Sequence, residues 1–343
     1  MVTVKDIFYH FRQKQNEGKF SSPILEFLET VPGFKTKHEV NGEIMNMSIA
    51  MSVIRICDKM AEDLLLMKTK PNAIPFLNEY FCVHEANSSD PQQFLRDLDY
   101  GSYDFKYHGL SYVYQYFRDS VVPVTGITPE GKEDIGTAYY IGDGRFVSAA
   151  HCIKGLERFN ILLHDGSRLP IKRIAFAKEQ NLEEYDLAVI FTEAPISYPA
   201  LWLQDPKVLE DVLTMGYPPI PCFDLIKVAE TASVGVIIQG GPKSVAGQVV
   251  APGKSYLSPL DYFLINARVK GGNSGGPVIN GEGKVIGTIV EIPFDSIGGS
   301  DTGRYDIMGF GVCLPSRYVN QLLLNPEEKI VLDDGNYYML VKN

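Results

Sequence analysis

The stretch Gly-Gly-Asn-Ser-Gly-Gly-Pro, residues 271–277, decides how this chain is interpreted. Four glycines around one serine allow a tight turn that exposes the hydroxyl of Ser274 and lets the main chain approach a ligand closely. Such a turn also leaves backbone N–H groups free to bind an oxyanion. Glycine-rich turns without any chemistry are common, so the stretch by itself leaves both interpretations open. The choice depends on whether a base and a carboxylate lie elsewhere in the sequence.

Two upstream segments supply those groups. His151 follows an alternating apolar stretch, Gly136 to Val147, and Asp186 stands at the head of an apolar run that predicts a buried strand. A serine nucleophile needs a general base for its proton and a carboxylate that holds the imidazole in the right tautomer. Each residue also has a plainer interpretation: a core histidine, a strand cap and a turn hydroxyl. The three sequence contexts together favour a catalytic triad of His151, Asp186 and Ser274.

These three segments resemble those of trypsin-like (chymotrypsin-like) serine proteases, in which His, Asp and Ser occur in the same order. The likeness is strongest for the HtrA group, because Asn273 precedes the serine where digestive proteases have an acid. Two further segments, Leu213 to Pro218 and Gly309 to Leu324, are similar to the mid-domain turn and to the closing strand and helix of HtrA protease domains. The resemblance covers about residues 119 to 325.

The resemblance implies an all-β fold of two antiparallel barrels over residues 116–325. Expected strands, separated by turn signals, include 121–124, 233–239, 262–269 and 285–292. Residues 326–343 are interpreted as a short C-terminal extension. Because so few residues follow Asn325, we expect no peptide-binding PDZ domain of the kind that usually follows in HtrA proteins.

By the same resemblance, Ser274 attacks a peptide carbonyl while His151 takes its proton and Asp186 orients the ring. The backbone N–H groups of Gly272 and Ser274 are expected to form the oxyanion hole. The implied activity is that of a serine endopeptidase acting on protein or peptide substrates without a cofactor. A catalytically silent, protease-like binding module is the alternative, and the same triad could also serve an esterase.

A segment after the serine is expected to contact the substrate. The run Val290, Glu291 and Ile292 resembles the strand that pairs with substrate backbone in this family, and a plain barrel strand is the alternative interpretation. Substrate identity and cleavage preference do not follow from the sequence.

Departures from the family pattern concern the same site. Digestive proteases bond the cysteine after the histidine to an upstream partner, but residues 136–140 contain no cysteine, so we expect Cys152 to be a buried free thiol. Asn273 cannot form the ion pair with a new amino terminus that activates digestive zymogens, which argues against activation by cleavage. The pair Gly271 and Gly272 leaves the oxyanion loop free to flip a peptide, and neighbouring loops govern that flip in HtrA-like proteins.

Residues 1–115 differ in character and predict a mainly α-helical domain of unknown role, regulatory or partner-binding. Between Met45 and Met67 apolar residues recur at spacings of four and three, the pattern of an amphipathic helix. Five of the nine methionines fall in this stretch, either as core packing or as an adaptable groove for a partner. Further helices are predicted at 5–15, 23–30, 73–81 and 91–97. We hypothesise that this domain gates the oxyanion loop.

The composition of the chain sets its possible domain number and argues against some classes of binding partner. A chain of 343 residues with 45% hydrophobic content can bury the cores of two domains. The net charge of −10 is spread along the chain without a basic stripe, which argues against nucleic acid as a partner. Cys82 and His84 are two candidate metal ligands without a second pair at zinc spacing, so no metal site is expected.

The lack of a recognisable targeting signal and the pattern of cysteines predict the cellular location of the protein. The first residues soon carry charge and lack a long apolar core, and no stretch is apolar enough to span a membrane. The five cysteines are odd in number and widely spaced, which fits unpaired thiols in a reducing compartment. We therefore expect a cytoplasmic protein without a membrane partner, in contrast to the mostly exported bacterial HtrA proteins.

Overall fold

The protein is described by a computed structural model that covers residues 2–38, 42–83, 90–177, 186–194, 196–219, 241–254, 260–290 and 310–341. By its internal contacts the chain divides into two compact units, Met1–His108 and Gly109–Asn343. This division falls before the boundary near residue 115 that was expected from the sequence.

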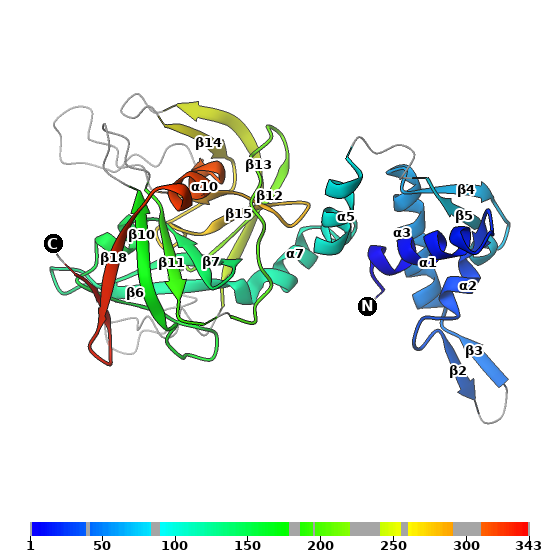
Figure 1. The fold of residues 1–343 in the computed structure, drawn as a ribbon, viewed down its shortest axis with the longest axis horizontal. Coiled ribbons are helices and arrows are strands. Elements are labelled where there is room, and N and C mark those ends of the chain that lie inside the picture. Colours follow the sequence, from blue (N-terminus) through cyan, green and yellow to red (C-terminus); the bar gives the residue numbers. More distant parts are fainter. Residues whose placement is uncertain are drawn as a thin grey trace. The chain divides into compact units, whose positions relative to one another are not determined.

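The C-terminal unit contains two closed antiparallel β-barrels, as the sequence predicted (Figure 1). The first barrel consists of β6 (Val121–Ile127), β7 (Glu133–Gly142), β8 (Arg145–Ser148), β9 (Arg158–Ile161), β10 (Ile171–Ala177), β11 (Ala188–Thr192), β18 (Pro326–Asp333) and β19 (Tyr338–Leu340). The second consists of β12 (Asp211–Gly216), β13 (Lys243–Lys254), β14 (Asp261–Ile265), β15 (Pro277–Asn280), β16 (Val285–Ile289) and β17 (Gly311–Pro315). Three of the four expected strand segments overlap β6, β14 and β16, while 233–239 lies outside the described residues.

Each barrel encloses its own apolar core. Phe146, Phe159 and Phe176 fill the first barrel and are at most 1% exposed. Phe263 and Ile286 lie in the core of the second barrel. Burying one such side chain stabilises the fold by about 1.5–3 kcal/mol, so these cores hold the barrels rigid.

The C-terminal residues, expected only as a short extension, complete the first barrel. Around this barrel the strands follow the order β10-β11-β8-β7-β6-β9-β19-β18, so the β18–β19 hairpin lies between β9 and β10. Strand β18 pairs with β10 from Arg173↔Ile330 to Ala177↔Pro326. On the other side, Tyr338 of β19 pairs with Phe159 of β9.

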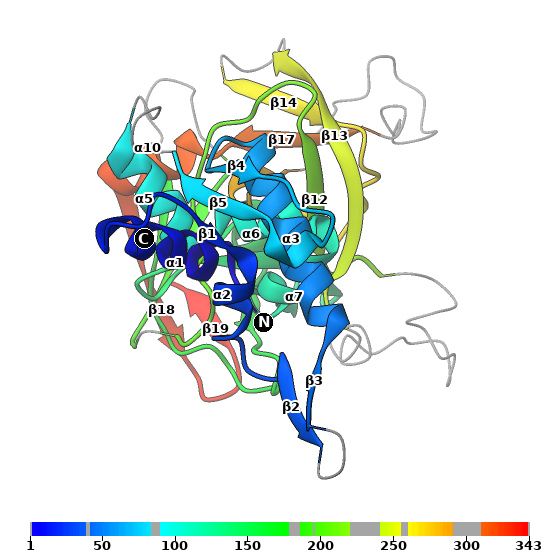
Figure 2. The ribbon, with the colours of Figure 1, turned by 90° about the vertical axis from the view of Figure 1, so that its right-hand side faces the viewer.

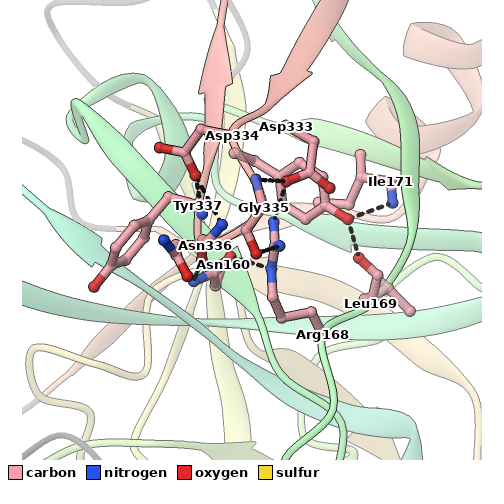
Figure 3. A network of polar contacts seen from close by, with 10 residues as sticks. Asn160, Arg168, Leu169, Ile171, Asp333, Asp334, Gly335, Asn336 and Tyr337 are labelled. Atoms are coloured by element: carbon pink, nitrogen blue, oxygen red, sulfur yellow. Dashed lines mark hydrogen bonds and ion pairs between the residues drawn. The ribbon is translucent and has the colours of Figure 1, made fainter.

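A polar network fixes this hairpin to the barrel (Figure 3). The guanidinium of Arg168 donates to Asn160 Oδ1 at 2.9 Å, to Gly335 O at 2.9 Å and to Asp333 Oδ1 at 3.0 Å. It also stacks 4.3 Å above the ring of Tyr338, which is buried and donates its hydroxyl to Leu169 O at 3.1 Å. The hairpin is therefore part of the barrel rather than a loose tail.

In the described part of this unit there are four short helical segments: α7 (Leu110–Phe117), η2 (Arg118–Ser120), α8 (His151–Lys154) and α10 (Arg317–Leu324). Helix α10 agrees with the expected closing helix. Helix α7 packs against β12, and Tyr114 donates its hydroxyl to Pro242 O at 3.1 Å. Residues 109–117 therefore belong with the barrels.

The N-terminal unit combines helices with two small sheets (Figure 2). Its helices are α1 (Val4–Asn16), α2 (Ile24–Leu28), α3 (Met47–Glu62), α5 (Pro91–Tyr100) and α6 (Ser102–His108). Its strands are β1 (Ser22–Pro23), β2 (Lys35–His38), β3 (Gly42–Met45), β4 (Leu66–Lys70) and β5 (Glu79–Cys82), arranged as a sheet in the order β1-β5-β4 and a β2–β3 hairpin. Helix α5 begins as expected, with Asp90 Oδ1 accepting from the N–H groups of Gln92 and Gln93.

The prediction of a helix at residues 73–81 is wrong. Pro75–Leu77 forms a single 3-10 turn, η1, and the residues after it form β5, the central strand of the sheet. Tyr80 is fully buried there between two neighbouring strands. Aromatic residues favour such a half-covered pleated surface, and this tertiary packing outweighs the local helical pattern.

The methionines around α3 are mostly exposed. Met60 is fully buried, but Met45, Met47, Met51 and Met67 are between 41% and 50% exposed. Core packing therefore accounts for one of the five. Within the described residues, no helix is both long and apolar enough to cross a membrane.

Candidate active site

Strand register brings His151 and Asp186 together. His151 is the first residue of α8, three residues after the end of β8, and Asp186 comes two residues before β11. These two strands are antiparallel neighbours in which Ser148 pairs with Ala188. The end of one strand and the start of the other therefore meet at the same edge of the barrel.

The Asp186 carboxylate holds His151 at two points. Its Oδ2 lies 2.6 Å from His151 Nδ1, and its Oδ1 accepts the backbone N–H of His151 at 2.9 Å. This arrangement places the ring proton on Nδ1 and leaves Nε2 as the basic nitrogen. Burial favours the neutral ring, but the hydrogen bonds and charges of Asp186 and Cys152 outweigh it and raise the pKa of His151.

Ser274 lies in the same cleft as His151. A cleft of about 80 Å³ is lined by both residues together with Gly271, Gly272 and Cys152. Ser274 is 7% exposed and lines this opening. Among the described residues, Ser274 Oγ and His151 Nε2 share the cleft without a direct hydrogen bond.

The loop before the serine forms a type II turn. Asn273 N donates to Lys270 O at 3.0 Å, and within the glycine pair only Gly272 has a positive φ, of +90°. A Cβ on Gly272 would lie 2.5 Å from Tyr217 O, whereas a Cβ on Gly271 would meet nothing within 4 Å. Only the second glycine is therefore required by this conformation.

Two carbonyl groups of the loop are tied to the protein interior. Gly272 O accepts from Thr137 Oγ1 at 2.7 Å and from Tyr217 N at 3.2 Å. Ser274 O accepts from Thr137 N at 2.9 Å and from Cys152 Sγ at 3.4 Å. In the part of the chain that the structure describes, the N–H groups of Gly272 and Ser274 donate to no protein group. These two donors are available to a ligand.

Cys152 is a buried free thiol, as predicted. Its Sγ lies 3.5 Å from His151 Nε2, and a Cβ on Gly136 would come within 2.6 Å of it. The thiol therefore fills the space left by the missing side chain of Gly136 and lines the cleft beside the imidazole.

Of the residues expected to contact substrate, only Val290 is described. It is 4% exposed, and its N–H donates to Val312 O at 3.0 Å. That N–H is already used within the barrel. Glu291 and Ile292 lie outside the described residues, as does His84 of the candidate metal pair. Over the described ranges, no three His, Cys, Asp or Glu side chains gather as metal ligands.

A family model identifies the fold around this cleft, because residues 136–287 match the trypsin-like peptidase domain. Those residues form a trypsin-like peptidase domain. It contains His151, Asp186 and Ser274, and the β18–β19 hairpin lies outside the matched range.

The relatives of this trypsin-like peptidase domain include HtrA proteins. Serine protease HTRA4 of Homo sapiens is 31% identical over 150 residues, which are 42% of this chain and 27% of that protein. A probable periplasmic serine endoprotease, DegP-like, of Chlamydia pneumoniae is 27% identical over 221 residues, 61% of this chain and 39% of that protein. The chain thus spans well under half the length of these curated relatives.

Two solved structures are also similar to the chain. The HtrA-type protease AlgW with tripeptide is 19% identical, with a TM-score of 0.44 and coverage of 62% of each chain. The Rv3671c protease from M. tuberculosis in its active form is 20% identical, with a TM-score of 0.45 and coverage of 62% of this chain and 82% of that chain.

Sequence analysis did not identify Thr137 or Tyr217 as neighbours of the serine loop. Thr137 stands in an alternating strand pattern like any buried threonine, and Tyr217 follows a strand of the other barrel. No local signal distinguishes them, because both contacts are long-range. The contact of Thr137 with Gly272 spans 135 residues and crosses between the barrels, and the contact of Tyr217 with Gly272 joins two distant segments of the second barrel.

Proposed function

We propose that the C-terminal unit is a serine endopeptidase in which His151, Asp186 and Ser274 form the catalytic triad. The observation that carries the proposal is the 2.6 Å contact between Asp186 Oδ2 and His151 Nδ1 at the edge of a cleft that also holds Ser274. A carboxylate in this position orients the imidazole and stabilises its cation. Membership of the trypsin-like peptidase domain supports the same activity.

The mechanism follows from the hydrogen bonds of the site. Ser274 Oγ attacks a peptide carbonyl while His151 Nε2 takes its proton, and Asp186 keeps the other ring proton on Nδ1. His151 then gives the proton to the leaving amine, and water repeats the cycle to release the acid product. For the first step, Nε2 exchanges its 3.5 Å contact with Cys152 Sγ for a hydrogen bond to Ser274 Oγ.

The unused N–H groups of Gly272 and Ser274 are the proposed oxyanion hole. The N–H of Gly272 lies on the type II turn and that of Ser274 comes directly after the turn, and neither is consumed by a protein acceptor among the described residues. A donor of this kind stabilises the transition state by about 3–4 kcal/mol. The expected pairing of Val290 with substrate backbone stays a prediction.

Peptide hydrolysis tests this function against the alternatives. We expect the full chain to cleave a peptide library, read by mass spectrometry, and the Ser274→Ala variant to leave the library intact. Cleavage by both proteins would assign the activity to a contaminant or to another site. Ester hydrolysis without any peptide cleavage would favour an esterase. No hydrolysis by a folded wild-type protein would favour the binding module.

We further propose that the N-terminal unit regulates the peptidase by binding a protein partner. The exposed side chains of Met45, Met47 and Met51 support this proposal, because flexible thioether side chains suit an adaptable contact surface for a partner. A truncated chain should begin at Gly109, since α7 packs on β12 and a start at residue 116 would remove that helix.

Gating predicts that the truncated chain hydrolyses peptides at a different rate from the full chain. Equal rates in a folded truncation would remove the gating role. The matched comparison is the full chain with Met47→Ser and Met51→Ser, which changes the exposed methionines without changing the chain length.

We place the protein in a reducing compartment, consistent with the cytoplasm. Cys57, Cys152 and Cys313 are buried free thiols, and Cys152 lies against the proposed base, where oxidation would disturb the site. Fractionation of source cells should find the protein with cytoplasmic markers, and recovery from an exported fraction would overturn this assignment.

A further inference from the structure

Thr137 of β7 contacts the nucleophile loop through both its backbone and its side chain. It is fully buried. Its N–H donates to Ser274 O at 2.9 Å, and its Oγ1 donates to Gly272 O at 2.7 Å. The same hydroxyl accepts from Tyr217 N at 3.1 Å. A threonine hydroxyl has one proton to donate, so its donor capacity is fully used by the loop.

The two carbonyl groups that Thr137 binds belong to the two residues of the proposed oxyanion hole. We propose that Thr137 is a positioning residue whose hydroxyl holds the oxyanion loop in the conformation that binds the transition state. This inference rests on the proposed peptidase function. It assigns to a residue of the first barrel the control of a loop that belongs to the second.

Peptide planarity explains how one hydroxyl can set the loop. The peptide between Gly272 and Asn273 is held at both ends: its carbonyl by Thr137 and Tyr217, and its N–H by Lys270 O. Because each peptide is a rigid plane, this fixes the positions of both flanking Cα atoms. The carbonyl of Ser274 is held in turn by Thr137 N, so the nucleophile cannot rotate independently.

One peptide of the turn stays free to rotate. A type II turn converts to type I when its central peptide flips, and here that peptide joins Gly271 to Gly272. Thr137 does not bind it. Its N–H, from Gly272, is one of the two proposed oxyanion donors. Thr137 therefore holds the residues on either side of this peptide. Rotation of that one peptide then determines whether the oxyanion hole is open or blocked.

Removing the Thr137 hydroxyl weakens the hydrogen bonds that hold the oxyanion loop without changing the volume of the side chain. In a Thr137→Val variant, Gly272 O keeps only Tyr217 N at 3.2 Å, and Tyr217 N loses its second acceptor. The valine fills the same volume. A general packing role predicts lower stability with normal chemistry, whereas a positioning role predicts a specific loss of transition-state binding.

The test compares full-length Thr137→Val and Thr137→Ser with a matched control, Thr192→Val. Thr192 is also a buried threonine of the first barrel, and its hydroxyl shares its one proton between two carbonyls, those of Gly144 at 3.1 Å and Ala194 at 2.6 Å. For each protein one measures kcat and KM on a cleaved peptide, the inhibition constant of a peptide boronate as transition-state analogue, and the melting temperature.

We expect Thr137→Val to lower kcat by about tenfold to hundredfold, less than the loss of a whole oxyanion donor. Its KM should stay within about twofold, and its boronate affinity should fall by the same factor as kcat. Thr137→Ser keeps the hydroxyl and should restore kcat to within about threefold. Thr192→Val should lower the melting temperature without these kinetic changes.

Several outcomes would overturn the inference: a normal kcat in Thr137→Val, an equal loss in Thr137→Ser, or an equal loss in Thr192→Val. If Thr137→Val does not fold, Thr137→Ala and Thr137→Ser are compared instead, because they also differ by the hydroxyl alone. A wild-type chain that neither cleaves peptides nor binds the boronate rejects the proposed function itself, which is a different result.

Discussion

The proposed acid–base pair and the loop that carries the proposed nucleophile are held in place by different means. His151 and Asp186 sit at the ends of two adjacent strands of one barrel, so the sheet register sets their distance. Ser274 sits on a loop of the other barrel, fastened across the junction by hydrogen bonds from Thr137. The first arrangement is as rigid as the barrel, whereas the second depends on a few individual contacts.

This difference suggests where regulation can act. Changing the register of β8 and β11 would require unfolding the first barrel. Rotating one peptide beside Gly271 requires no change in either core, because a side chain there would meet open space. The position of the proposed base is therefore fixed by the sheet, and the proposed oxyanion hole is the adjustable part of the site.

The largest expected effect comes from the rigid half. Asp186→Asn should leave the fold intact and lower kcat by about 10⁴-fold, the loss known for the corresponding change in the general serine-protease template. The physical reason is that an amide cannot hold His151 in the tautomer that leaves Nε2 basic. The measurement is kcat at saturating peptide, with near-ultraviolet circular dichroism as the control for folding. A loss below about tenfold would mean that Asp186 does not orient the base.

The glycine pair gives the next largest effect. Gly272→Ala should lower kcat by about 10²–10³-fold, comparable to losing one oxyanion donor, because its Cβ would lie 2.5 Å from Tyr217 O at a φ of +90°. Gly271→Ala is the matched control and should keep most of the activity, since its Cβ meets no atom within 4 Å. Equal losses in the two variants would contradict the type II geometry of the loop.

The pH dependence gives a smaller effect. Burial alone would lower the pKa of His151, but Asp186 and Cys152 raise it above its ordinary value of 6.5. Because the base must be neutral, kcat/KM should fall as the pH drops through this raised pKa, so the acid limb lies above pH 6.5. The Cys152→Ala variant lacks one of the contacts that raise the pKa of His151, so the acid limb of its kcat/KM profile should move to lower pH. A limb that stays in place would show that the thiol does not act on the imidazole.

The smallest effect on turnover is expected from the C-terminal hairpin. Tyr338→Ala removes a buried ring that packs in the first barrel and carries the Arg168 guanidinium, so it should destabilise the fold by about 3 kcal/mol or more. The hydrolysis rate per folded molecule should stay the same. Leu332→Ala, at a side chain 54% exposed, is the control and should change little. Thermal unfolding measures both, and a large change in kcat for Tyr338→Ala would connect the hairpin to the site.

Local sequence signals predicted much of this arrangement. The motifs around His151, Asp186 and Ser274 are short and specific, and the spatial meeting of the base and its acid follows from the strands on either side. The free thiol of Cys152 could also be predicted, because residues 136–140 contain no cysteine with which it could form a disulfide.

Long-range pairing is what the sequence did not disclose. Strands β10 and β18 pair although they lie far apart in the sequence, with Arg173 donating to the side chain of Glu328 155 residues away, and nothing in either segment specifies the other. The contact of Thr137 with Gly272 is of the same kind. The strand β5 was missed for a related reason, because Tyr80 owes its conformation to neighbours on β1 and β4 rather than to its own surroundings in the chain.

The most direct test of the central claim is reaction of the full-length protein with a fluorophosphonate, followed by intact mass and peptide mapping. The account predicts one adduct per chain on Ser274, formed much more slowly in Asp186→Asn and absent in Ser274→Ala. No adduct on the folded wild-type protein, or an adduct that persists in Ser274→Ala, would contradict it.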